Sequence, residues 1–142
     1  MVILKHIINK KYDNNRKIKL KNIHRNNVLN YGDWGIVALE SGTITPNQIE
    51  TARCILSKNI KNIGKLSVKI LPDWLITRRP KDSRMGSGKG KAYKWVFVTR
   101  PGDVLFEATK ITKYVLFNIF KLVKSKFPIK IKLIYKNGIY SN

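Results

Sequence analysis

Acidic residues are scarce in this sequence: 8 Asp and Glu face 29 Lys and Arg, giving a formal net charge of +21 over 142 residues. A compact domain with such an excess repels itself and is usually stabilised by a polyanion. Nucleic acid is the commonest such partner, and an anionic membrane surface is the alternative. The few acids show no paired spacing and fall mainly at predicted turns and helix starts. This pattern argues against acid–base catalysis and against a metal-dependent nuclease.

Cysteine, histidine and long apolar runs are scarce as well. Cys54 is the only cysteine, and His6 and His24 are the only histidines, so we expect no intrachain disulfide, metal site or cofactor. We expect Cys54 to be a small residue at a helix–sheet contact rather than a nucleophile. No apolar run reaches the roughly 20 residues that span a bilayer. The N-terminus shows neither a signal-peptide cleavage site nor a transit-peptide composition.

What the chain does contain is enough apolar material for a core. Hydrophobic residues make up 43% of the sequence, which excludes wholesale disorder, and the length favours one domain. We predict a basic N-terminal arm over residues 1–30 and a single domain over residues 31–142. The arm either orders on RNA, which we favour, or remains a solvated tail. Its candidate RNA-binding residues are Arg16, Lys17, Lys19, Lys21 and Arg25.

Hydrophobic periodicity predicts two helices and several strands. The helices are expected over residues 45–63 and 110–126. Strands are expected over residues 31–43, 65–71, 75–79, 93–99, 104–108 and 129–133. We expect 75–79 to pair with 65–71, and 104–108 to form a hairpin with 93–99. The simplest packing places both helices on one face of a mainly antiparallel sheet, so the predicted class is α+β.

Each predicted helix has a distinct apolar stripe. Thr45 is the expected N-cap of the first helix, and Gln48 completes a capping box. Arg53, Ser57 and Lys61 share another face, which is either solvated or follows RNA phosphates. The residues expected to point inward are Ile49, Ala52, Leu56, Ile60 and Ile63 in the first helix, and Ile111, Val115, Ile119, Leu122 and Val123 in the second.

The most informative segment is a glycine-rich loop of eight residues. It has three glycines and three cations without a carboxylate, and it runs Arg84, Met85, Gly86, Ser87, Gly88, Lys89, Gly90, Lys91. Glycine permits close backbone approach, and the cations favour an anionic partner. A nucleotide-binding P-loop is rejected, because no Ser or Thr follows either lysine and the next element is a strand. Among the tryptophans, the nearby Trp74 is the best candidate for stacking on a base, although a tryptophan in such a position is more often buried.

Several motifs, in order, resemble the ribosomal large-subunit protein sixteen family. The loop is similar to the family signature Arg-Met-Gly-Lys-Gly-Lys-Gly, with Ser87 in place of a lysine. The basic N-terminal segment of the family is not recognisable. The other matching segments are Tyr31–Glu40, Ile44–Arg53, Gly64–Asp73, Trp95–Val96, Pro101–Glu107 and Lys126–Lys130.

The resemblance implies a structural, non-enzymatic protein bound to large-subunit rRNA beside other ribosomal proteins. It also implies that the glycine-rich loop points toward the A-site tRNA and the peptidyl-transferase region. A Lys-, Asn- and Ile-rich composition indicates an AT-rich genome and favours a mitochondrial ribosome, with the bacterial cytoplasm as the alternative. The candidate rRNA-binding residues are Arg16, Lys17, Lys19, Lys21, Arg25, Arg53, Lys61, Arg78, Arg79 and Arg84.

A second functional class remains open at this point. The protein could be a free-standing basic protein that binds anionic membranes through a helix over residues 114–126. That helix is apolar on more than one face, which suits burial against a sheet better than lying on a membrane.

Overall fold

The computed structural model describes residues 11–13, 29–61, 63–86 and 88–136. Two helices and eight strands are assigned within these ranges. In chain order they are β1 (Lys11–Asp13), β2 (Trp34–Ala38), β3 (Gly42–Ile44), α1 (Pro46–Ile60), β4 (Leu66–Val68), β5 (Trp74–Arg78), β6 (Lys91–Thr99), β7 (Val104–Ala108), α2 (Lys113–Lys124) and β8 (Ile131–Tyr135). The predicted α+β class is confirmed.

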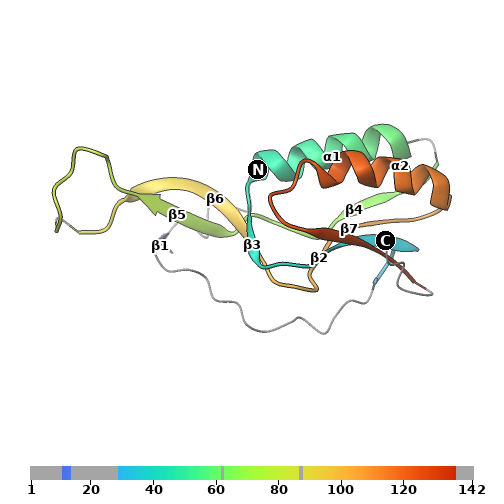
Figure 1. Ribbon diagram of the computed structural model, residues 1–142, viewed down its shortest axis with the longest axis horizontal. Coiled ribbons are helices and arrows are strands. Elements are labelled where there is room, and N and C mark those ends of the chain that lie inside the picture. Colours follow the sequence, from blue (N-terminus) through green and yellow to red (C-terminus); the bar gives the residue numbers. More distant parts are fainter. Residues whose placement is uncertain (1–10, 14–28, 62, 87, 137–142) are drawn as a thin grey trace.

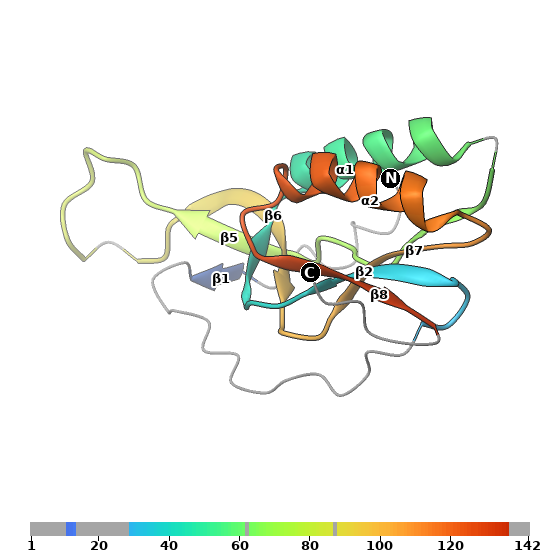
Figure 2. The same ribbon diagram turned by 45° about the vertical axis from the view of Figure 1, so that its right-hand side comes forward.

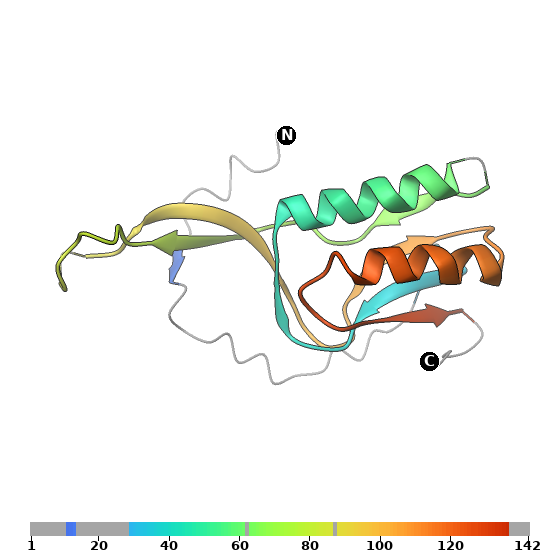
Figure 3. The ribbon, with the colours of Figure 1, turned by 45° about the horizontal axis from the view of Figure 1, so that its top comes forward.

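The strands are divided between two four-stranded sheets. One sheet has the order β4-β7-β2-β8 and is antiparallel throughout. The other has the order β1-β5-β6-β3, in which β1 is parallel to β5 and the other pairs are antiparallel. Helices α1 and α2 lie antiparallel to each other over the first sheet, while β5 and β6 project away from this body as a long hairpin (Figures 1 and 3).

Two predicted strand pairings are wrong. Strand β7 pairs with β2 and β4 rather than with β6, and β5 pairs with β6 and β1 rather than with β4. The turn before β7 explains the first error. Gly102, with a φ of 96°, donates its N–H to Ala38 O at 2.8 Å, and Ala38 N–H donates to Asp103 O at 3.0 Å. The turn is thus fixed to the end of β2, so β7 continues beside β2 instead of folding back on β6.

Helix α1 packs much as its sequence predicts. Gln48 Oε1 accepts a hydrogen bond from Thr45 N–H at 2.9 Å, as expected for a capping box. Ile49, Ala52, Leu56 and Ile60 are buried. The expectation for Ile63 is wrong, because the helix ends at Ile60 and Ile63 is 47% exposed.

Helix α2 begins three residues later than predicted, and most of the residues expected inside it do face the core, with Ile111 lying just before the helix. Its buried residues are Leu116, Ile119, Phe120 and Val123, while Val115 packs partly against the same core. Leu122, expected inside, is 56% exposed. Since successive helical residues are about 100° apart, a face centred on Ile119, Phe120 and Val123 leaves Leu122 outside. Among the described residues, no helix is long and apolar enough to cross a membrane.

The main core lies between the helices and the sheet that they cover. Trp34, Ile36 and Phe106 are buried at its centre, and Phe127 packs against Phe106 with ring centroids 6.2 Å apart. At about 25 cal/mol per Å² of apolar surface, burial of such large side chains is the main stabilising contribution. The β5–β6 hairpin extends beyond this core, so its outer half gains little from it.

Candidate nucleic-acid interface

The glycine-rich loop lies at the tip of the β5–β6 hairpin. Cross-strand register runs from Trp74 opposite Val96 to Arg78 opposite Lys91, with an irregularity between Ile76 and Thr77. The loop therefore stands at one end of the molecule, far from both helices (Figure 1). A two-stranded hairpin of this length presents the loop to a partner without bringing the partner into contact with the core.

The glycines of the loop serve two different purposes. Gly86 and Gly88 have φ values of 107° and 79°, and a Cβ added to either would meet no atom within 4 Å. They are required for the backbone direction, which side-chain-bearing residues rarely adopt. Gly90 is required for space instead, because a Cβ there would lie 2.7 Å from the carbonyl carbon and oxygen of Arg78. The loop can thus expose its main chain at the tip and close tightly at its base.

Four cations surround a hollow of about 170 Å³ inside the loop: Arg79, Arg84, Lys89 and Lys91. None of the described residues that line it is acidic. Arg79 Nη2 donates a hydrogen bond to Gly88 O at 2.7 Å, so this guanidinium ties one side of the loop to the other. A concave, cationic surface of this kind suits the oxygens of a phosphate group.

The hairpin also carries an exposed aromatic ring beside two cations. The Tyr93 side chain is 55% exposed. Arg78 Cζ lies 5.3 Å and Lys94 Nζ 5.6 Å from the ring centroid, which is within the range of cation–π attraction. Trp74 and Trp95, in contrast, are half-buried. Tyr93 is therefore a better stacking candidate than Trp74, and the sequence analysis missed it because it considered only tryptophan for base stacking.

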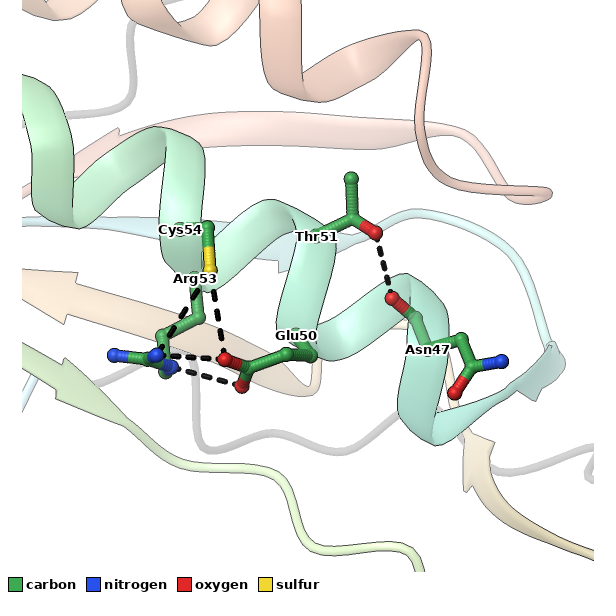
Figure 4. Close-up of polar contacts among 5 residues, drawn as sticks. All are labelled: Asn47, Glu50, Thr51, Arg53 and Cys54. Atoms are coloured by element: carbon green, nitrogen blue, oxygen red, sulfur yellow. Dashed lines mark hydrogen bonds and ion pairs between the residues drawn. The ribbon is translucent and has the colours of Figure 1, made fainter.

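The predicted basic face of α1 is partly neutralised. Arg53 donates to Glu50 through Nε at 2.8 Å and through Nη2 at 2.6 Å, as Figure 4 shows. Hydrogen bonds from Arg53, and then from Cys54, lower the pKa of Glu50 to about 2. Lys61 is exposed one residue beyond the helix end. Arg53 and Lys61 are therefore not equivalent: one guanidinium already holds a carboxylate, whereas the lysine is placed toward solvent.

Cys54 lies on the solvent side of α1, so its predicted place at a helix–sheet contact is wrong. Its Sγ–H donates to Glu50 Oε1 at 3.4 Å (Figure 4). The buried face of α1 is already occupied by Ala52 and Leu56, and position 54 falls about 200° of helical rotation from position 52.

The other predicted residues divide into two groups. Arg78, Arg79 and Arg84 come together along the hairpin and its loop, and all three are exposed. The predicted sites that lie outside the described residues are Arg16, Lys17, Lys19, Lys21, Arg25 and Ser87. Residues 11–13 of the predicted arm form β1 beside β5, with Lys11 opposite Leu75.

A buried carboxylate of β7 holds the backbone that leads into β2. Glu107 Oε1 accepts the N–H of Asn30 at 3.2 Å, and Oε2 accepts those of Tyr31 and Gly32 at 2.9 and 3.2 Å. Lys69 Nζ lies 3.6 Å from Oε1 and 4.4 Å from the centroid of the Tyr31 ring. We call this arrangement the Glu107 clamp.

Charge balance within the clamp keeps Glu107 ionised. Burial opposes ionisation of this carboxyl, but the N–H groups of residues 30–32 and the ammonium of Lys69 outweigh it and lower its pKa. Gly32 is required for the close approach, since a Cβ there would lie 2.9 Å from Glu107 Cβ. The sequence analysis missed the clamp, although a single acid within an apolar strand was a signal for it.

Among the described residues, no group of three or more His, Cys, Asp or Glu side chains could hold a metal ion. In a comparison with family models, the chain matches Ribosomal protein L16p/L10e over residues 7–134. The chain belongs to this family. The matched range contains the clamp, both helices and the glycine-rich loop. The match confirms the resemblance of the motifs to that family. The family is one of structural constituents of the large ribosomal subunit and is typically non-enzymatic.

Proposed function

We propose that this protein binds large-subunit rRNA near the A-site tRNA and the peptidyl-transferase region, with the glycine-rich loop as the element that reaches farthest. The observation that carries the proposal is the loop itself: an acid-free group of cations, with two glycines at positive φ, mounted at the end of a projecting hairpin. Family membership supports the ribosomal setting.

The mechanism is electrostatic and depends on shape. Lysines and arginines displace counterions from closely packed phosphates, which favours binding most strongly at low salt. Arg84, Lys89 and Lys91 provide charge around the hollow, while Gly86 and Gly88 let main-chain N–H groups approach phosphate oxygens. Contacts of this type recognise the backbone and the shape of folded RNA more than base identity. The core and the Glu107 clamp hold the hairpin and the root of the N-terminal arm in a fixed relation.

We also propose a mitochondrial ribosome as its location, supported by the Lys-, Asn- and Ile-rich composition of the chain. The bacterial cytoplasm is the alternative. Fractionation of the source cells, followed by sucrose-gradient sedimentation of the organelle and of the cytosol, separates the two: the protein should travel with the large subunit of one compartment only.

The loop is tested by replacing Arg84, Lys89 and Lys91 together with alanine. We expect weaker association with the large subunit, or lower A-site tRNA occupancy where the variant is incorporated, with an unchanged melting temperature because all three side chains are exposed. The log–log slope of RNA affinity against salt concentration should become shallower by about 0.7–0.9 for each phosphate that the variant no longer neutralises.

The matched control replaces Lys58, Lys126 and Lys136, which are exposed on the main body, and removes the same charge elsewhere. The control should keep most of the association and of the A-site occupancy. If both triple variants behave alike, total charge rather than the loop determines binding. If neither differs from the wild type, the proposed role of the loop is wrong.

A further inference from the structure

Helix α2 has an aromatic surface on the side that faces away from the core. Tyr114 is 78% exposed and Phe117 is 46% exposed, one turn apart along the helix. Lys121 lies one further turn along, with its Nζ 5.0 Å from the centroid of the Phe117 ring. We call these three residues the aromatic face of α2. The opposite side of the helix is buried, because it packs into the main core.

The charged residues of α2 all have one sign. Lys113 stands one turn before Phe117 and Lys124 two turns after it, and α2 contains no Asp or Glu. No acid follows Glu107 anywhere in the sequence. A partner that covers Tyr114 and Phe117 must therefore bring negative charge to the lysines on both sides.

RNA fits this combination better than a protein or a membrane. The centres of protein interfaces are enriched in aromatic residues but depleted in lysine, whereas here the lysines surround the rings. A membrane-bound helix buries a broad apolar face about 5–10 Å into the headgroup boundary. The apolar face of α2 is already occupied by the core, and little more than Tyr114, Phe117 and Leu122 remains outside. Aromatic rings flanked by cations are the usual platform for an unstacked base and its phosphates.

We propose that the aromatic face of α2 stacks an unpaired base of rRNA, with Lys121 and its neighbouring lysines on the adjoining phosphates. The inference rests on the proposed rRNA-binding function but concerns another part of the molecule. The helices and the glycine-rich loop lie at opposite ends of the structure, as Figures 1 and 2 show. The protein would then hold two separate RNA segments, one by backbone and shape and the other by stacking.

The test uses the full chain with Tyr114→Leu and Phe117→Leu combined, which keeps apolar volume and removes the π surfaces. Affinities for a single-stranded oligoadenylate and for an RNA duplex of equal length are measured by fluorescence anisotropy at one fixed salt concentration. The double variant should bind the oligoadenylate at least about fivefold more weakly and the duplex as the wild type does. Leu122→Ala is the matched control, since it removes an exposed apolar side chain from the same helix without removing a ring.

The remaining outcomes each decide the question. Equal oligoadenylate binding by wild type and double variant would overturn the stacking proposal while leaving the loop function intact. An equal loss on duplex would also overturn it, because stacking on a free base requires a single strand. Flotation with vesicles containing anionic lipid, lost in the double variant while oligoadenylate binding is kept, would assign the face to a membrane. A wild type that binds neither RNA would overturn the proposed function and this inference with it.

Discussion

Replacement of Glu107 by glutamine tests the Glu107 clamp, which ties residues 30–32 to β7. The substitution preserves size and removes the charge. If the new amide oxygen takes the place of Oε2, it can still accept from Tyr31 and Gly32. The NH₂ group then replaces Oε1, where it faces two donors, Asn30 N–H and Lys69 Nζ. One hydrogen bond is lost, and Lys69 loses its carboxylate partner.

The loss of folding stability in Glu107→Gln can be estimated from these contacts. Hydrogen bonds to a charged group contribute about 1.5–3 kcal/mol each, and one such bond is lost, so the free energy of unfolding should fall by about 2 kcal/mol. For a chain of this size, that corresponds to a melting temperature lower by roughly 6–10 °C. Glu50→Gln is the control: its carboxylate is exposed, and surface ion pairs contribute about 0–1 kcal/mol.

Both variants are compared with the wild type by thermal melts followed by circular dichroism, at neutral pH and through the acid range. The folded-state pKa of Glu107 lies below its ordinary value of 4.5. The ionised carboxylate therefore stabilises the fold above pH 4.5, and this contribution is lost as the pH falls through the lowered pKa. The difference in melting temperature between the wild type and Glu107→Gln should therefore become smaller below about pH 4.5.

Two results would refute this reasoning. A Glu107→Gln variant as stable as the wild type at neutral pH would show that the three N–H groups do not depend on the carboxylate charge. A gap that stays constant into strong acid would show that ionisation is not the source of the difference. In either case the clamp would be a packing feature rather than an electrostatic one.

Three further predictions concern the hairpin and α1. Gly90→Ala should destabilise the β5–β6 hairpin by about 1–3 kcal/mol, because the added methyl group overlaps backbone atoms of Arg78. Gly86→Ala, whose site is open, should cost about 1–3 kcal/mol through its positive φ alone. Hydrogen exchange along β5 and β6 distinguishes the two, because only the methyl group at position 90 meets β5. Glu50→Gln should raise RNA affinity modestly and steepen the dependence of that affinity on salt, since Arg53 loses the carboxylate that neutralises it. An unchanged salt slope in filter-binding titrations would exclude Arg53 from the RNA interface. Cys54, exposed on α1, should react completely with a thiol reagent in the folded protein; protection without denaturant would contradict the outward position of its side chain.

Much of the local structure was predictable because its signals are local. The N-cap at Thr45 and the apolar stripe of α1 lie within one short segment, and their spacing determines which side of the helix is buried. The glycine-rich loop was recognisable for the same reason, since its glycines and cations are consecutive. The charge excess, the α+β class and the family motifs also follow from the sequence alone.

The tertiary structure decided which strands meet. Periodicity assigns a strand to a segment but does not select its neighbour, and β7 pairs with β2, which lies far from it in sequence, instead of with the adjacent β6. The clamp has the same origin, since Glu107 and residues 30–32 are about 75 positions apart and meet only once β7 lies beside β2. The outward rings of α2 likewise depend on which helix face the sheet covers. The net charge and the local geometry of helices and loops are properties of the sequence. Strand pairing and side-chain exposure are set by packing, because the residues that bury one another come from segments that no local sequence pattern connects.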